Sequence, residues 1–314
     1  MDGHRPIALE GLKTYPLRSR KSKVSVADAA RAWKRGGSLA QLLDSLPNIL
    51  AARDLRAVVA RIVEARRAGR PVVMGIGGHV IKVGLSPLLV DLMERGVLTA
   101  LAMNGSGIIH DFELALVGHT SEEVEEVLGE GAFGMAEETG RILNEAIAAG
   151  ARDGLGLGEA VGRRLAAMDL PHAEMSLLLA GHRLGVPVTV HVALGADIIH
   201  MHPAVDGAAV GAASHRDFLR FAGVIAALEG GVYLNVGSAV IMPEVFVKAL
   251  SLVRNLGHEV RRFTTVNLDF IQHYRPRVNV VQRPTQQGGE GYALTGHHEI
   301  MLPLLCAAVL EALP

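Results

Sequence analysis

Three apolar runs of the chain each end in a turn made of glycine or other small residues. They occupy residues 72–80, 100–111 and 232–240. Each run is typical of a strand buried on both faces of a parallel sheet, and a helical pattern follows each turn. In a doubly wound sheet such turns gather at the carboxyl edge of the strands, where ligands bind beside the topological switch point. The pattern therefore predicts a ligand-binding pocket at that edge.

Helical and strand periods alternate along most of the chain. Helices are expected at 26–33, 38–46, 55–67, 85–95, 135–149, 158–168, 173–184, 215–228 and 300–313, with another opened by Pro243 and Glu244. Further strands are expected at 98–103, 187–192 and 262–268. The alternation predicts an α/β fold, a doubly wound and mainly parallel sheet of Rossmann-like type over residues 71–314. Residues 1–70 are expected to form an N-terminal arm and helices packed on that core.

Two groups of residues are expected to serve helix starts rather than chemistry. Thr120 and Glu123 have the spacing of a capping box, in which a hydroxyl and a carboxylate satisfy exposed amides. Asp217, together with His215 and Arg216, stands where the helix at 215–228 is expected to open. Both groups therefore favour a structural interpretation.

Composition narrows the classes of function. The chain has 314 residues, of which 49% are hydrophobic, enough to bury a large core. Its net charge of −1 gives no electrostatic footprint of a protein that binds nucleic acid or a membrane surface. Cys306 is the one cysteine, which excludes a disulfide framework and a thiolate-rich zinc site. The chain shows no signal peptide and no apolar stretch that could cross a bilayer, so we expect a cytoplasmic protein.

Glycine and small polar residues follow the three apolar runs. Gly77 and Gly78 let the backbone approach a ligand closely, and the helix after them offers amide donors to an anion. The standard dinucleotide fingerprint is not met, because Val80 stands in place of its third glycine. A tight turn that needs glycine for its angles is an open alternative. The residues expected to line a nucleotide are Gly77, Gly78, His79, Asn104, Gly105, Ser106, Gly107, Gly237 and Ser238.

Histidines are frequent near the expected strand ends. His110 is a candidate proton acceptor because imidazole titrates near neutrality, and Asp111 beside it would orient the ring or hold a substrate cation, or else cap a turn. His200 and His202 are further catalytic candidates, although such a pair is more often hydrogen-bonded in a pocket or core. An alternative is a Zn or Fe site. Its ligands would come from His79, His110, His200, His202, His297 and His298.

The order of these blocks resembles deoxyhypusine synthase, an NAD-dependent enzyme that moves an aminobutyl group from spermidine to a protein lysine. The similarity runs from about residue 70 to the C-terminus. The positions that match the family's pattern include Gly107, Ile108, Asp111, Phe112, Asp197, His202 and Asn267. The resemblance implies a deoxyhypusine synthase-like fold, NAD as cofactor with Asp197 and Asn267 among its contacts, a small amine-bearing substrate and a homotetramer.

The chain departs from that family at the catalytic lysine. Counted from Arg283 and Pro284, the lysine position is Tyr292 and the preceding tryptophan position is Glu290. A phenol cannot form a Schiff base, so the family's covalent transfer is not available there. Three hypotheses follow: an enzyme that binds NAD or a related nucleotide and acts on a small amine without making deoxyhypusine; a histidine-based metal-dependent hydrolase or lyase; and a non-catalytic binding protein on the same fold.

Overall fold

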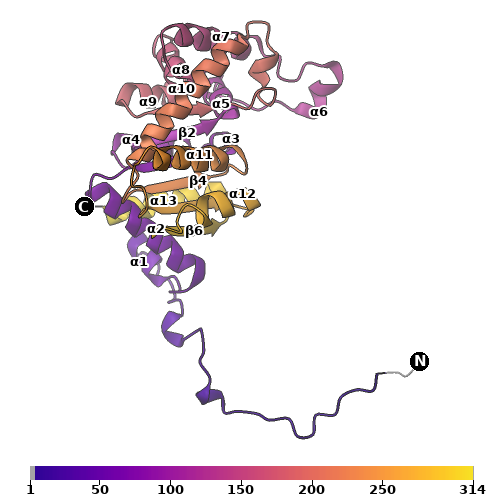
Figure 1. Ribbon diagram of the computed structural model, residues 1–314, viewed down its shortest axis with the longest axis vertical. Helices are drawn as coiled ribbons and strands as arrows, with labels where there is room; N and C mark the ends of the chain where they lie inside the picture. The colour runs from indigo at the N-terminus through magenta and orange to yellow at the C-terminus, as the bar shows by residue number, and fades with distance from the viewer. Residues whose placement is uncertain (1–3, 314) are drawn as a thin grey trace.

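Six parallel strands form the sheet at the centre of the structure, a computed structural model that describes residues 4–313 (Figure 1). The strands are β1 Val72–Ile76, β2 Ala100–Asn104, β3 Val188–His191, β4 Val232–Val236, β5 Thr264–Asp269 and β6 Glu290–Thr295. Their order in the sheet is β3-β2-β1-β4-β5-β6, and every neighbouring pair is parallel. The chain runs outward from β1 in one direction and from β4 in the other, so the switch point lies between these two strands. The predicted doubly wound α/β fold is confirmed.

Helices connect the strands and cover both faces of the sheet. The α-helices are α1 Leu39–Ser45, α2 Leu50–Arg67, α3 Gly78–Lys82, α4 Ser86–Glu94, α5 Gly105–Val117, α6 Val124–Val127, α7 Glu137–Arg152, α8 Leu157–Ala166, α9 Leu177–Leu184, α10 Gly207–Ala226, α11 Ile241–Asn255, α12 Tyr274–Pro276 and α13 His298–Ala312. Short turns of other helix types are η1 Leu17–Ser19, η2 Val26–Asp28, η3 Leu128–Glu130, η4 Ala173–Met175, η5 Ile198–Met201 and η6 Arg277–Gln282.

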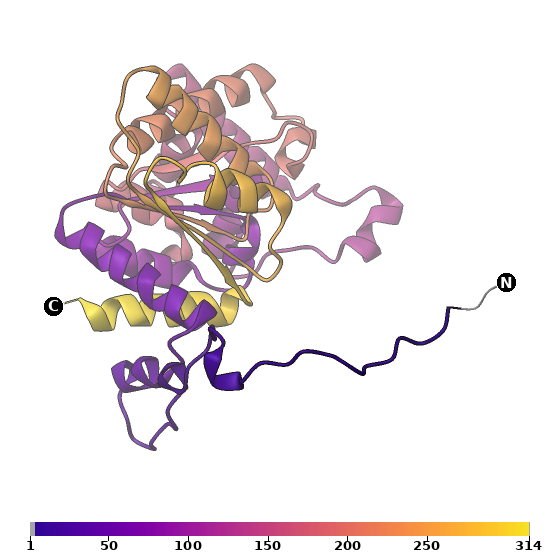
Figure 2. The same ribbon diagram turned by 60° about the horizontal axis from the view of Figure 1, so that its bottom comes forward.

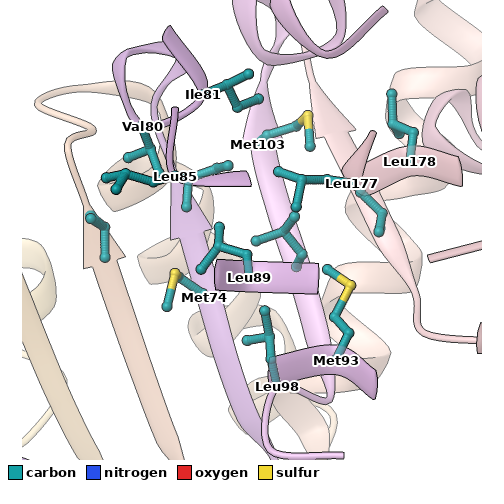
Figure 3. Packing of buried hydrophobic residues seen from close by; sticks show 14 of the residues in the cluster. Met74, Val80, Ile81, Leu85, Leu89, Met93, Leu98, Met103, Leu177 and Leu178 are labelled. Atoms are coloured by element: carbon teal, nitrogen blue, oxygen red, sulfur yellow. The ribbon is translucent and has the colours of Figure 1, made fainter. Parts of the chain in front are cut away.

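The core is built in two layers, one on each face of the sheet. Successive strand residues point to opposite faces, so Met74 joins the layer under α2, α4 and α13, whereas Val73 joins the layer under α10 and α11. Figure 3 shows part of the first layer, in which Met74, Leu89 and Leu98 pack together. In the second layer Tyr233 stacks on Phe246 with ring centroids 3.9 Å apart. Burial on both faces explains why the strands read as continuous apolar runs.

Helix α10 seals the outer edge of β3. The Asp217 carboxylate accepts hydrogen bonds from the amides of Val190 and Gly158, each at 2.8 Å, and Ser214 bonds the Val190 carbonyl and the Val192 amide. The expectation that Asp217 opens its helix is therefore wrong, because α10 begins ten residues earlier at Gly207 with Asp206 as its cap. Asp217 instead serves the first turn of α8 and the edge strand.

The N-terminal segment extends away from the body of the molecule (Figures 1 and 2). The helix expected at 26–33 is wrong, since helical structure there is limited to one turn at Val26–Asp28. Val26 is 94% exposed, so that segment lacks the buried apolar face that stabilises a short helix. Helix α1 packs on α13, and α2 lies across β1, β4, β5 and β6.

Other differences from the predicted elements lie in segments where the hydrophobic periodicity of the sequence is weak. The strand β6 was not expected, because its residues alternate between exposed and half-buried positions and carry Glu290 at its start. The capping box at Thr120 is wrong: the chain around it is irregular, and Thr120 bonds side chains of α5 instead. Within the part of the chain that the structure describes, we find no helix long and apolar enough to cross a membrane.

Candidate active site

The turns after β1 and β4 touch each other at the switch point. The Gly77 amide donates to the Val236 carbonyl at 3.0 Å, and a Cβ at Gly77 would overlap the Gly237 carbonyl oxygen. Gly237 has φ of +66°, a conformation that favours glycine. Both glycines are therefore required by the meeting of two turns, which supports the structural alternative for this motif.

A buried histidine lies directly beneath these turns. His298, at the start of α13, is 1% exposed and its Nε2 lies 3.7 Å from Asp269 Oδ1, at the end of β5. Neither ring nitrogen has a hydrogen-bond partner within residues 4–313. Burial lowers the pKa of His298, while the Asp269 carboxylate and the nearby Leu268 carbonyl act in the opposite direction. A buried polar group without a partner is unusual and points to a functional role.

Exposed rings cover this histidine. His79, in the first turn of α3, is exposed and meets the His298 ring edge-on with centroids 5.6 Å apart. Phe270 meets His298 from the β5 side at 6.1 Å and stacks on the exposed His297. The surface of the switch point is thus formed by His79, Phe270 and His297, with His298 and Asp269 below.

The carboxyl ends of β4, β5 and β6 are tied together by amide side chains. Asn235 donates to Asn267 Oδ1 at 2.7 Å, Asn267 donates to Gln272 at 2.7 Å, and Gln272 reaches the Leu294 carbonyl. Ser238 Oγ accepts from the Met242 amide and so holds the start of α11. Asn267 and Ser238, both expected to contact a cofactor, are engaged within the protein.

A second polar group lies at the ends of β2 and β3. Ser106 donates to Asn104 Oδ1 at 3.0 Å, and the Asp197 carboxylate fills the space that a Cβ at Gly105 would need. Asp197 is mostly buried, which raises its pKa, and it accepts from the Ala193 amide. Gly78 lies against Ser106 and joins this group to the switch point.

Two further predicted contacts are explained by packing. Gly107 faces the Met103 side chain, and Gly78 leaves no space for a Cβ beside Ser106 and His110. Gly78 therefore allows α3 to pack closely on α5, whereas Gly107 makes room for the Met103 side chain of β2.

A chain of hydrogen bonds through Thr120 links the His110 side chain of α5 to Glu113 of the same helix. Its Nδ1 lies 2.8 Å from Thr120 Oγ1, and Thr120 donates to Glu113, which also accepts from Thr139. Burial, with a smaller contribution from Lys82, lowers the pKa of His110 to about 4. This value lies below the neutral range expected for the ring, because the half-buried ring is poorly solvated, and the role of His110 as a proton acceptor stays a prediction.

Asp111 does not act on His110. It is fully buried and accepts from the Ser176 hydroxyl at 2.5 Å and from the Leu177 amide at 2.6 Å, so it holds the start of α9. Burial raises its pKa to about 7. Asp111 therefore caps a distant helix and not a turn of its own segment, and the catalytic role expected for it stays a prediction.

The remaining histidines lie apart from the switch point. His200 accepts from the Gly195 amide in the loop after β3, and His202 pairs with Glu137 of α7 at 3.2 Å. Within the described residues 4–313, no three histidine, cysteine or carboxylate side chains come close enough to hold a metal ion. In the described part of the chain the six histidines of the Zn or Fe alternative form no common cluster, although the rings of His79 and His298 are in contact.

Two residues of this edge escaped the sequence analysis. Asp269 directly follows the strand predicted at 262–268, just as Asn104 follows the strand predicted at 98–103. Polar residues directly after a strand are candidate site residues, and this rule, applied to every predicted strand, would have found Asp269. Glu113 lies three residues after His110, so the two side chains share one face of α5. This spacing indicates that they can interact and could have drawn attention to Glu113. Its link through Thr120 depends on the tertiary structure.

The fold and the switch-point site define a Rossmann-like, doubly wound α/β protein. No protein-family model matches the sequence. No curated protein matches it in sequence either.

Three of the solved structures that resemble the chain illustrate the likeness. A conserved LOR/SDH-type protein from Methanococcus maripaludis S2 matches with a TM-score of 0.54 and 13% identity, covering 84% of this chain and 70% of that one. AgrE, in a ternary complex with ornithine and NAD+, matches with a TM-score of 0.52 and 18% identity, covering 84% of this chain and 34% of AgrE. This chain therefore spans about a third of AgrE. A deoxyhypusine synthase-type protein from Entamoeba histolytica matches distantly, with a TM-score of 0.47 and 11% identity over 90% of this chain and 96% of that one.

These likenesses concern the fold alone. The two of these structures with TM-scores above 0.5 are 13% and 18% identical to this chain, so they show a shared fold and nothing finer. The structural neighbours include an enzyme, the arginine dihydrolase ArgZ, and the complex of AgrE with ornithine and NAD+.

Proposed function

We propose that this chain is an enzyme that binds NAD or a related nucleotide at the β1–β4 switch point and acts on a small amine. One observation carries the proposal. His298 is buried at the position where doubly wound sheets bind ligands, lacks a hydrogen-bond partner among the described residues, and lies between Asp269 and the exposed His79.

The turn after β1 suits the anionic part of a nucleotide. Within the described residues, the amides of Gly78 and His79 donate to no protein acceptor. Free amides of this kind are hydrogen-bond donors to phosphate oxygens. When bound, NAD would supply a hydride acceptor. A neighbour of the same fold, AgrE, was solved with NAD+, which gives weak support.

Carboxylates near the strand ends suit an amine as the other ligand. Asp197, Asp269 and Glu113 lie at or near the carboxyl edge, and each is partly or fully buried. An ammonium group is stabilised beside such carboxylates. Ornithine, the amino acid bound to AgrE, is therefore the first substrate to test.

The proton chemistry is assigned to His79. This ring is exposed and can contact a bound molecule, whereas His298 and Asp269 lie beneath it and act as positioning residues. The Asp269 carboxylate favours a protonated His298 ring against the effect of burial.

Calorimetry with NAD+ and ornithine on the full chain tests the proposal. We expect NAD+ to bind and, at saturating excess, to raise the melting temperature, since a ligand at a hundredfold excess over its Kd stabilises a fold by about 2.7 kcal/mol. The absence of binding and of a thermal shift with either compound would favour a non-catalytic binding protein.

The substitution His79→Gln is expected to lower turnover at least about 100-fold, because a group that transfers a proton contributes that much, while NAD+ affinity changes little. The measurement is kcat and KM in parallel with calorimetry. His258→Gln is the matched control, because His258 is also exposed but lies after α11, away from this edge. Equal activity of both variants would contradict the role of His79.

A further inference from the structure

A groove of about 430 Å³ lies between α1, α2 and the last turns of α13. Helix α13 contacts both α1 and α2, and Figure 2 shows the three helices beside one another. Asp44 and Glu311 line the groove, and both are exposed. An apolar groove beside exposed carboxylates suits a ligand that is both apolar and basic. Its apolar lining is formed by Leu43, Leu55, Val59, Val63 and Ala308.

The groove lies away from the switch point. Helix α13 begins at His298, beneath the candidate active site, whereas the groove touches this helix only at Ala308, Glu311 and Ala312. About ten residues of helix separate His298 from Ala308, which corresponds to about 15 Å at 1.5 Å per residue. A ligand in the groove therefore neither covers nor completes the candidate active site.

The N-terminal segment has the apolar and basic character that the groove suits. Residues 12–17 are here called the strap segment, and their apolar side chains, Leu12, Tyr15 and Leu17, are each at least 65% exposed. Pro16 has φ of −64° and ψ of 133°, an extended conformation, and a proline also favours an extended residue before it. Residues 12–23 contain five lysines and arginines and no acidic residue.

The chain leaves the body of the molecule beside the groove. The Asp28 carbonyl accepts from the Asn48 amide at 3.0 Å, and Asn48 Oδ1 accepts at 3.3 Å from Arg56, which lines the groove. The eleven residues from Asp28 back to Leu17 can span about 36 Å when extended. The part of α2 that lines the groove, residues 55–67, is about 18 Å long, so the strap segment can reach all of it.

We infer that the strap segment docks in the groove of its own chain. Six extended residues span about 20 Å, which matches the length of the groove. Docking would bury three large apolar side chains against the apolar lining and bring Lys13 near the exposed carboxylates. A short tether favours the chain's own segment over that of a second copy, because it gives a millimolar effective concentration. The extended position in Figure 1 leaves the groove open, and the inference does not depend on the proposed function.

Disulfide trapping in a glutathione redox buffer tests the inference. Thr14→Cys with Ala60→Cys should form a disulfide within one chain, with an effective thiol concentration at least about tenfold above that of Thr14→Cys with Arg66→Cys. Ala60 lines the groove, whereas Arg66 is exposed on the same helix and donates to the Arg95 carbonyl outside the groove. Cys306 is buried and should not exchange. Equal effective concentrations would overturn the inference, and disulfides between chains would assign the groove to a second copy and reject docking within one chain.

Serine substitutions give the matched comparison for the strap segment. Leu12→Ser, Tyr15→Ser and Leu17→Ser together should abolish the difference between the two cysteine pairs, because burial of one leucine corresponds to about a tenfold change in an equilibrium constant. Ile7→Ser with Leu9→Ser removes exposed apolar side chains outside the strap segment and should leave the difference unchanged. A difference that survives the triple change, or is lost in the double change, would show that the strap segment does not dock. Circular dichroism checks that each variant is folded.

Calorimetry with a synthetic peptide of residues 8–20 gives a second readout. The triple serine variant should bind this peptide with a Kd below about 1 mM, because a tethered segment docks only if its Kd is below the millimolar effective concentration of its tether. The wild type should bind the peptide at least about tenfold more weakly, because its own strap segment competes for the groove. Equal binding by the two proteins, or binding by neither, would overturn the inference.

Discussion

Gly77→Ala is expected to lower the free energy of unfolding by about 3 kcal/mol or more, because overpacking against rigid backbone has no cheap relief. The new Cβ would overlap the Gly237 carbonyl oxygen, and neither turn can move without losing a hydrogen bond that joins β1, β4 and β5. Urea unfolding monitored by circular dichroism measures the change. NAD+ binding should fall with it, since both turns form the switch point.

Gly211→Ala is the matched control. Gly211 lies within α10, where a Cβ would meet nothing within 4 Å. Alanine in an exposed helix position should stabilise the protein by up to about 1 kcal/mol. Equal tolerance of the two substitutions would show that the contact between the turns is not a constraint.

Asp217→Ala is expected to lower the free energy of unfolding by about 2–5 kcal/mol, because it leaves two buried amide donors without an acceptor. Those donors are the amides of Gly158 and Val190, which share one carboxylate oxygen. Asp217→Asn keeps an acceptor at that place and should retain most of the stability. A loss in the asparagine variant as large as in the alanine variant would mean that the negative charge itself is required.

The same carboxyl predicts how stability depends on pH. Burial raises the pKa of Asp217 from its ordinary 3.8 to about 7, so the folded protein binds the proton more tightly than the unfolded chain. Stability from this group should therefore fall as pH rises between about 4 and 7, by at most about 1.4 kcal/mol per pH unit. The wild type should melt at a higher temperature at pH 6 than at pH 8, and the difference should shrink in Asp217→Asn.

Most of the fold was predictable because parallel strands buried on both faces leave an unmistakable pattern. The apolar run at 232–240 begins with β4, Val232–Val236, and the strands expected at 98–103 and 187–192 differ from β2 and β3 by one or two residues. The strand β6 was missed because an edge strand with alternating exposure carries a weak signal. The prediction of a helix at 26–33 was wrong because hydrophobic periodicity alone does not show whether a core is present for the apolar face to pack against.

The site was predictable in position but not in composition. Gly77, His79 and Gly237 do meet at the switch point, as strand-end placement predicts. Asp111 had both a chemical and a structural interpretation, and Asp217 was expected to cap its own helix. Only the tertiary structure shows that each holds the start of a helix from another element. Such long-range capping has no local sequence signal, because donor and acceptor lie about sixty residues apart.

The contacts of Asp217 and Ser214 also bear on the colloidal behaviour of the protein. An edge strand with free amides and carbonyls is a template onto which a foreign strand can add, and repeated addition leads to fibrils. Here the Val190 amide and carbonyl are both engaged by α10. As long as α10 stays in place, the β3 edge of the sheet offers no such template. Aggregation through the β3 edge therefore requires that α10 first detach from it.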